Sequence, residues 1–339
     1  MKFYPALVPL QRGVTLIELM VSLTIGLIIM IAVIGAYLGA SSAGRAAEAI
    51  GRMNEDGQMA LTILSQQLRM AGVNPSQPDR STATIAGSPN LRNNSVPLHN
   101  TVTNAYAIRG CDLRFSNVTA AASTSALTCG HTNSSSGPDS ISIAYEADRY
   151  NTVPTTAGLP TDCVGTRITP LTAVYQRSDE ISTATFSIYE AENRFYIGTS
   201  TSIINPTLYC KGNGNSSIQQ PVVENVENLQ FRYGTANPAA TTSPVYVSVT
   251  PTFTTTLAIG YLSAYEVDND TTVLTGAAGS DARWKAVKTV RICVVIRSEK
   301  PVLDNIESAK YLDCNGMLTT PADKRLRRAF STTVVLRNQ

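Results

Sequence analysis

One carboxylate lies inside the longest apolar run of the chain. Glu18 is, apart from Tyr37, the only ionisable side chain between Val14 and Ala40. A carboxylate within an apolar helix costs roughly 2.5 to 3.5 kcal/mol on membrane-insertion scales, so it is a functional candidate that needs a partner. Cleavage after Gly13 would free the α-amino group of Val14, which is cationic near neutral pH. We predict that this amine pairs with Glu18, either within one helix or between neighbouring copies.

The element that carries Glu18 is predicted to be a membrane-spanning helix. As a helix, Val14 to Ala40 would be about 40 Å long, which exceeds the roughly 30 Å hydrocarbon core of a bilayer. Lys2 and Arg12 precede the run, and no Lys or Arg follows until Arg45. The positive-inside rule therefore places the leader in the cytoplasm and the remaining chain outside it.

The order of the leader and the apolar run differs from that of a secretory signal, in which the apolar stretch precedes the cleavage site. Here the polar leader ends at Gly13, so the apolar helix would survive cleavage at that point. Two alternatives stay open. In the first, cleavage occurs after Ala43, with Ser41 at the minus-three position, and removes the helix. In the second, the side chain of Glu18 only extends to the membrane interface and has no pairing role.

Residues for catalysis are scarce. The chain has two histidines, His99 and His131, both in polar, loop-like sequence, and it lacks a phosphate-binding G-x-x-x-x-G-K-[ST] loop. A hydrolytic site formed by His131, Ser136 and Asp139 is a formal alternative, but solvated loop residues are the simpler interpretation. The sequence EVDNDTT, which contains Asp268, is similar to the start of a calcium-binding loop, but it lacks the required Gly and the distal Glu. We therefore expect no enzymatic activity, no metal and no cofactor.

Composition narrows the class of protein further. The chain has 339 residues, of which 43% are hydrophobic and only 15% are charged, with Ser, Thr, Asn and Gly abundant. This composition excludes a disordered or collagen-like chain and is not typical of a cytosolic protein. The net charge of +2 gives no field for a polyanion, so no nucleic acid partner is expected. One basic cluster is expected to form a solvated face: Lys324, Arg325, Arg327 and Arg328.

The cysteines point to disulfides rather than to a metal site. There are six, with no C-x-x-C pair among them. An even number in a polar chain that leaves the cytoplasm favours disulfides, although sequence alone does not choose the pairing and buried free thiols are the alternative. Our hypothesis joins neighbours along the chain: Cys111 with Cys129, Cys163 with Cys210, and Cys293 with Cys314.

The helical pattern continues beyond the apolar run. Gly72, followed by Pro75, is a stop signal for the helix. The polar face carries Arg45, Glu48, Arg52, Glu55 and Gln66. Apolar or small residues recur at spacings of three and four and form one stripe: Ile50, Met53, Gly57, Leu61, Leu64, Leu68 and Ala71.

The rest of the chain reads as loops and strands. Residues from Val73 to about Ser140 are rich in Ser, Thr, Asn, Gly and Pro, which favours loops and short strands. Clearer strands with period-two alternation follow, and no repeat of 20 to 50 residues is visible. The predicted strands are Ser140–Tyr145, Thr185–Tyr189, Arg194–Gly198, Val226–Tyr233, Val245–Val249, Thr289–Arg297 and Ala329–Arg337.

Two parts of the sequence resemble known families. The string RGVTLIELMVSLTIGL resembles the class III signal of type IV prepilins, with Val14 where that family most often has Phe. The strings EDGQMALTILSQQLRMAG, VENVENLQFRYG, VKTVRICVVIRS after Trp284, and RLRRAFSTTVVLRN are similar to PilW-like minor pilins. The middle part is also similar to the J-type minor pseudopilins of type II secretion.

The resemblance implies an α+β, type IV pilin-like fold. A helix from about Val14 to Met70 would pack on a β-rich, mainly antiparallel head. Prepilin peptidase would cleave after Gly13 and methylate the amine of Val14, and Glu18 would set the register of subunits. The implied segments are a leader at 1–13, a transmembrane helix at 14–40, its amphipathic half at 41–72, and a disulfide-stabilised periplasmic head at 73–339, divided into a loop-rich part at 73–221 and a strand core at 222–339.

The function implied is that of a minor pilin that primes or caps a filament. Its partners would be prepilin peptidase, the major pilin, other minor pilins, the inner-membrane assembly platform and the membrane itself. It would reside in the inner membrane before assembly and in the pilus, at its tip, afterwards. Two alternatives are a minor pseudopilin of type II secretion and a membrane-anchored adhesin or ligand-binding ectodomain.

Overall fold

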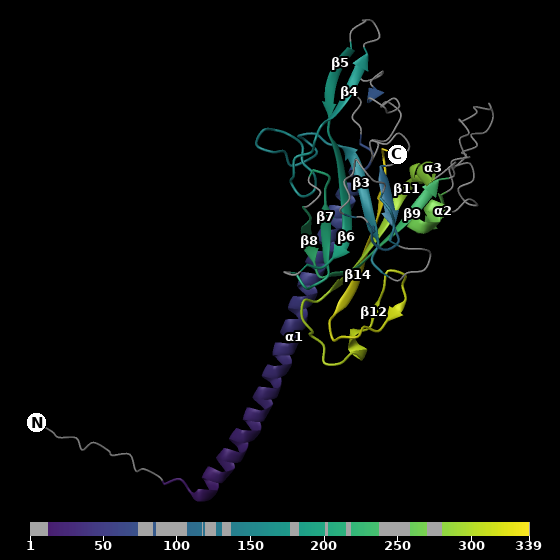
Figure 1. The fold of residues 1–339 in the computed structure, drawn as a ribbon. Helices are drawn as coiled ribbons and strands as arrows, with labels where there is room; N and C mark the ends of the chain where they lie inside the picture. Colours follow the sequence, from purple (N-terminus) through teal and green to yellow (C-terminus); the bar gives the residue numbers. More distant parts are fainter. Residues whose placement is uncertain are drawn as a thin grey trace, which may run out of the picture.

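The computed structural model of the chain combines one long helix with a β-rich head (Figure 1). All structural statements concern the described residues, which are 13–73, 84–85, 107–116, 118, 127–130, 137–176, 183–200, 203–214, 218–236, 258–269 and 280–338. The first part of the helix projects away from the head, and its second part lies against the head (Figure 1). This arrangement confirms the predicted α+β architecture.

Helix α1 spans Leu16–Met70 and contains 55 residues. It begins two residues later than expected because Thr15 is its N-cap and has extended backbone angles. It ends where the sequence predicted, since Gly72 adopts a φ of +72°, which only glycine adopts without strain. At 1.5 Å per residue the helix is about 80 Å long.

The second half of α1 buries one stripe against the head. Met53, Gly57, Leu64 and Leu68 are buried, as the spacing predicted. Leu61 is partly buried and packs against the same core, and the neighbouring Ala60, which the predicted stripe did not include, is fully buried. A small side chain there allows the helix and the sheet to approach closely. The predicted polar face is exposed at Arg45, Glu48, Arg52, Glu55 and Gln66. The prediction is wrong at Ile50, which is 45% exposed because the buried stripe of α1 begins only at Met53.

The helix packs on a four-stranded antiparallel sheet with the order β10-β9-β11-β14. The sheet comprises β9 (Val226–Ala236), β10 (Ala258–Leu262), β11 (Val287–Arg297) and β14 (Arg327–Val335). Strands β11 and β14 pair continuously from Thr289↔Val335 to Arg297↔Arg327, and both contact α1. The alternation of β11 buries Val290, Ile292 and Val294 in the core beneath the helix.

A second antiparallel sheet has five strands in the order β2-β3-β6-β7-β8. Its strands are β2 (Ile108–Cys111), β3 (Ser140–Glu146), β6 (Glu190–Gly198), β7 (Thr207–Lys211) and β8 (Gln220–Glu224). Side chains on one face of it, including Ile143 and Phe195, join the same core as β9, β11 and α1. The two sheets therefore share one hydrophobic core.

The other face of the five-stranded sheet contains charged residues that are buried. Arg194 is paired with Glu192 at 2.6 Å, and the hydroxyl of Ser142 donates to the same carboxylate. Register places Lys211 beside Arg194, and burial, followed by the charge of Arg194, lowers the pKa of Lys211. Buried charges of this kind are tolerated because each finds an opposite charge or a carbonyl.

Short elements complete the described structure. A three-stranded sheet contains β1 (Thr84–Ile85), β4 (Leu171–Gln176) and β5 (Thr183–Ile188), and a hairpin contains β12 (Tyr311–Leu312) and β13 (Leu318–Thr319). The remaining helices are α2 (Ala264–Asn269), α3 (Ser280–Lys285) and the 3₁₀ turn Glu307–Ala309. Six of the seven predicted strands correspond to β3, β5, β6, β9, β11 and β14, and Val245–Val249 lies outside the described residues.

Three disulfides staple the head. They join Cys111 to Cys129, Cys163 to Cys210, and Cys293 to Cys314, which are the chain neighbours proposed from the sequence. Each one ties a loop to a strand of a sheet, at β2, β7 and β11 respectively. Disulfides of this kind stabilise small extracytoplasmic domains mainly by restricting the unfolded chain.

Candidate functional site

The first candidate site is the start of α1, where Thr15 and Glu18 form a capping box. The Thr15 hydroxyl accepts a hydrogen bond from the backbone N–H of Glu18 at 3.3 Å. In return, the Glu18 carboxylate accepts from the backbone N–H of Thr15 at 3.4 Å. The sequence pattern Thr-x-x-Glu is a known signature of this arrangement, although the capping box was not among the features predicted above.

The capping box directs the carboxylate of Glu18 toward the beginning of the chain. The predicted pairing of the Val14 amine with Glu18 concerns the cleaved chain and stays a prediction. In the uncleaved chain Val14 lies outside the helix. The reason is that Thr15 takes the extended conformation of an N-cap and turns the preceding residues away from the helix axis. An anion is also favoured at this position because the helix dipole places partial positive charge at the N-terminus.

The bond between Gly13 and Val14 lies in exposed, non-helical chain. Both residues are exposed. A Cβ built on Gly13 would meet nothing within 4 Å. The fold of this chain therefore places no demand for glycine at position 13, and any such demand must come from a protein that binds this segment. An accessible, extended segment is also the form that a peptidase requires.

The apolar half of α1 is exposed along its whole length. Its most apolar window has a mean hydropathy of 2.6 and no buried residue. Among the described residues it is the one helix that is long and apolar enough to cross a membrane. Large side chains such as Leu16 and Ile31 are 79% and 70% exposed. A continuous apolar surface of this size requires lipid or other helices to cover it.

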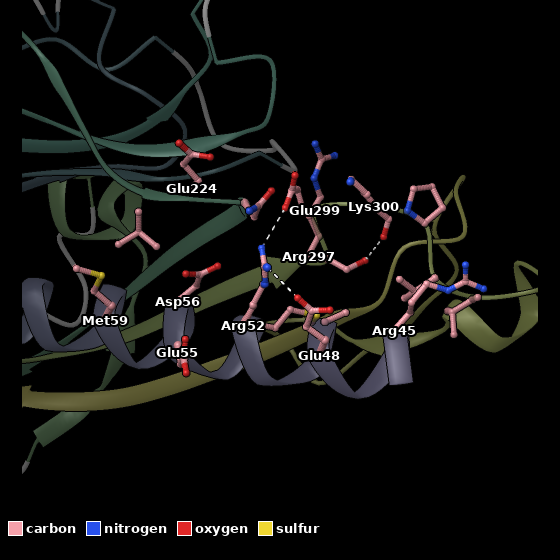
Figure 2. Close-up of a pocket in the computed structure, with 18 of the residues that line it drawn as sticks. Arg45, Glu48, Arg52, Glu55, Asp56, Met59, Glu224, Arg297, Glu299 and Lys300 are labelled. Carbon is pink, nitrogen blue, oxygen red and sulfur yellow. Dashed lines mark hydrogen bonds and ion pairs between the residues drawn. The ribbon is translucent and has the colours of Figure 1, made fainter. Parts of the chain in front are cut away.

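The second candidate site is a groove of about 820 Å³ where α1 enters the head (Figure 2). One side is formed by α1 from Arg45 to Met59. The other side is formed by the end of β8 with the following turn, and by the segment from Arg297 to Asp304. The groove thus brings together three parts of the chain that are far apart in the sequence, and no sequence motif predicts it.

The charges in this groove are only partly paired. Arg52 contacts Glu48 at 2.8 Å and Glu299 at 3.6 Å. Asp56 points from α1 toward the strand that carries Glu224 (Figure 2), and in the described part of the chain neither carboxylate has an ion-pair partner. Burial, the charge of Glu55 and the charge of Glu224 raise the pKa of Asp56, and the charge of Arg52 opposes them. The nearby carboxylates thus disfavour the ionised form of Asp56 in the free protein.

Two buried polar atoms in the wall of the groove lack hydrogen-bond partners among the described residues. Asn225 is 9% exposed and has a φ of +61°, and its Oδ1 accepts no hydrogen bond. The guanidinium of Arg297 donates to Asn205 at 3.0 Å, but its buried Nε has no acceptor. A buried polar atom without a partner costs roughly 1 to 3 kcal/mol, so such atoms call for an explanation.

The other residues considered for chemistry have structural roles or lie outside the described residues. His99, His131 and Ser136 are outside them. Asp139 is buried and accepts hydrogen bonds from the backbone of Phe231 at 2.8 Å and of Leu113 at 3.3 Å. Desolvation raises its pKa to about 7. Its carboxylate thus fixes two backbone segments rather than facing a substrate.

Asp268, from the calcium-like sequence, also has a structural role. It accepts a hydrogen bond from the indole of Trp284 at 2.8 Å and pairs with Arg109 at 3.2 Å. Trp284 packs edge-on against Tyr233 with ring centroids 4.9 Å apart. Within the described residues, no group of three or more His, Cys, Asp or Glu side chains is arranged to hold a metal ion.

The basic cluster at the start of β14 differs from the solvated face that was predicted. The side chain of Arg327 is 4% exposed and pairs with Glu227 at 2.8 Å and with Asp323 at 2.6 Å. Arg325 also pairs with Asp323. The acidic partners compensate for the burial of Arg327, so part of this cluster anchors the start of β14 to β9. The prediction of a wholly solvated cluster was wrong at Arg327.

Two family models match the chain at its two ends. Residues 9–34 match the prokaryotic N-terminal methylation motif, and residues 194–338 match the type IV pilus-assembly protein W. Together these matches support a type IV pilus minor pilin. No curated protein and no solved structure matches the chain.

The two matched regions coincide with the structural features described above. The methylation motif covers the Gly13–Val14 bond, the capping box and the first turns of the exposed apolar helix. The PilW match begins in β6 and extends through β14, so it includes the whole four-stranded sheet that packs on α1. The methylation motif, the exposed apolar helix and the disulfide-linked head thus support a type IV pilus pilin-like protein.

Proposed function

We propose that this chain is a minor subunit that primes or caps a type IV pilus. The observation that carries the proposal is the start of α1. There a carboxylate is held at the helix N-terminus, next to an accessible Gly13–Val14 bond, on a helix whose apolar surface has no cover of its own. Each of these features has a use in a filament whose subunits are stored in the membrane and then bundled through their helices.

Processing follows from the same geometry. Prepilin peptidase removes residues 1–13, and the amine of Val14 is methylated. Because the Glu18 carboxylate already faces the N-terminal side of the cap, the new ammonium group appears close to it. The pair neutralises the cost of keeping Glu18 within the apolar helix.

Glu18 then serves subunit registration. A neighbouring helix can offer its own N-terminal ammonium group to Glu18. The two charges meet at only one axial offset between the helices, and at every other offset Glu18 stays unpaired in an apolar environment. The ion pair between Glu18 of one subunit and the N-terminal ammonium group of the next therefore fixes the axial offset between neighbouring helices. The partners in this step are the major pilin and the other minor pilins, on the assembly platform of the inner membrane.

The minor role is proposed from the size of the head. It extends from Val73 to Gln339 and carries two principal sheets, so a repetitive lattice of such heads would be crowded. A terminal position avoids this problem, since only the helix must enter the bundle. The activity we propose is assembly, without catalysis, with the head outside the cytoplasm and finally at the pilus tip.

The proposal is tested by deleting the gene and counting filaments. A priming subunit is needed to start filaments, so deletion should strongly reduce their number, and the wild-type chain should be recovered from sheared filaments in substoichiometric amount. Normal piliation with a loss of adhesion alone would favour the adhesin alternative. Normal piliation with a loss of protein secretion would favour the pseudopilin alternative.

A further inference from the structure

We infer that the groove at the junction of α1 and the head, defined by Asp56, Glu224 and Asn225, receives a lysine or arginine side chain of an adjacent pilin subunit. The inference deepens the proposed function and rests on it, because it supplies a second contact between subunits outside the membrane. It concerns a surface that the capping box and the apolar helix do not include.

The charge arrangement selects a cation. Asp56 on α1 and Glu224 at the end of β8 both line the groove (Figure 2), and the charge of Glu224 helps to raise the pKa of Asp56. Arg52 opposes this shift, but its guanidinium is held between Glu48 and Glu299. An ammonium or guanidinium group bound beside Asp56 would offset the repulsion from Glu224.

The wall of the groove provides an independent indication. Asn225 lines the groove, is 9% exposed, and its Oδ1 has no hydrogen-bond donor among the described residues. A left-handed backbone at Asn225 holds this amide in the turn between β8 and β9. An unsatisfied acceptor in the wall of a groove that Asp56 and Glu224 also line matches a ligand with several N–H donors, as both Lys and Arg have.

The size and location of the groove favour a protein side chain over a metal ion. The volume of about 820 Å³ is far more than one ion needs, and the wall includes the apolar groups of Met53, Met59 and Val223. The aliphatic stem of Lys or Arg would cover such groups. The groove also lies on the part of α1 that follows the apolar run, where a neighbouring subunit of a helical bundle would lie.

The test uses full-length protein recovered from membranes of piliated cells. The double variant Asp56→Asn, Glu224→Gln removes both charges but keeps the size of each side chain. Glu307→Gln is the matched control, since Glu307 is an exposed carboxylate of the head that does not line the groove. The measurement is the amount of other pilins that co-purify with each form in detergent, together with the thermal unfolding of each form.

The double variant is expected to lose about fivefold or more in recovered pilins, with Glu307→Gln unchanged. It should unfold at the same temperature as wild type or higher, because a repulsion has been removed, and this separates loss of a partner from misfolding. Equal recovery from both forms would overturn the inference, as would loss of recovery from the wild type on chelation of divalent cations. Failure of the wild type itself to co-purify with any pilin would instead contradict the proposed function.

Discussion

The ring of Phe330 on β14 lies directly against the backbone of Gly57 on α1. A Cβ at residue 57 would come within 2.6 Å of Cδ2 of that ring. The glycine lets the helix and the sheet edge approach closely in the middle of the stripe that buries α1 against the head. The close packing of α1 on the head therefore requires a residue without a side chain at position 57.

Gly57→Ala should destabilise the head, although alanine is the better helix former. The gain in helix propensity is about 1 kcal/mol, whereas a clash with Phe330 costs roughly 1 to 3 kcal/mol. Gly51→Ala is the matched control, since a Cβ there meets nothing within 4 Å. Urea unfolding of the full-length protein in detergent should show a lower free energy of unfolding for Gly57→Ala and a higher one for Gly51→Ala. Stabilisation by both would show that Phe330 moves aside at no cost.

Asp139 should make the protein less stable as pH rises. Its pKa is raised from 3.8 to about 7 by desolvation, so its neutral form is favoured in the folded state. The associated stability is fully present below about pH 4 and is lost as pH rises through about 7, a change on the order of a few kcal/mol.

The check is the difference between wild type and Asp139→Asn in the free energy of unfolding at several pH values. The amide keeps one acceptor oxygen, so it can accept from only one of the backbone N–H groups of Phe231 and Leu113, and the variant is expected to be less stable at pH 4. Because it does not titrate, its disadvantage should shrink between pH 4 and 7. A constant difference across that range would contradict the assignment.

The disulfides should differ in their contribution to stability. Cys163 and Cys210 are 47 residues apart, whereas Cys111 and Cys129 are 18 apart. If each stabilises by restricting the unfolded chain, replacement of the first pair by alanine should cost about 0.8 kcal/mol more than replacement of the second. Thermal or denaturant unfolding of the two double variants measures this directly. The reverse order would mean that native contacts around Cys111 outweigh chain entropy.

Glu18 can be tested so that capping and charge are separated. Glu18→Gln keeps the capping box, in which Gln serves as well as Glu, but removes the charge. Glu18→Ala removes both. If the charge sets subunit register, neither variant should enter filaments although both remain in the membrane. Incorporation of Glu18→Gln at the wild-type level would show that only the helix cap matters.

The sequence was sufficient to predict the helix and the longer strands. The apolar run, the stripe and the stop at Gly72 determine α1, and alternation over many residues marks β9 and β11. It did not reveal β7, which is short and buried throughout, or β8, an edge strand that contains Pro221. A strand that is buried throughout, such as β7, carries no alternating pattern of apolar and polar residues.

The candidate site was predictable only where it is local. Gly13, Val14 and Glu18 stand within six positions, so spacing and residue type single them out. The groove was not predictable, because it exists only when the chain places Asp56, Glu224 and Arg297 side by side. The burial of Arg327 was missed for the same reason, since its partner Glu227 is distant in sequence.

The intact mass of the protein recovered from filaments shows whether the Val14 amine is freed next to Glu18. We expect a chain that begins at Val14, lacks Met1 to Gly13, and carries the mass of one added methyl group on its N-terminus. Mass spectrometry of a filament preparation would give this in one measurement. A chain in filaments that still carries the leader, or one whose first residue lies beyond Glu18, would contradict it.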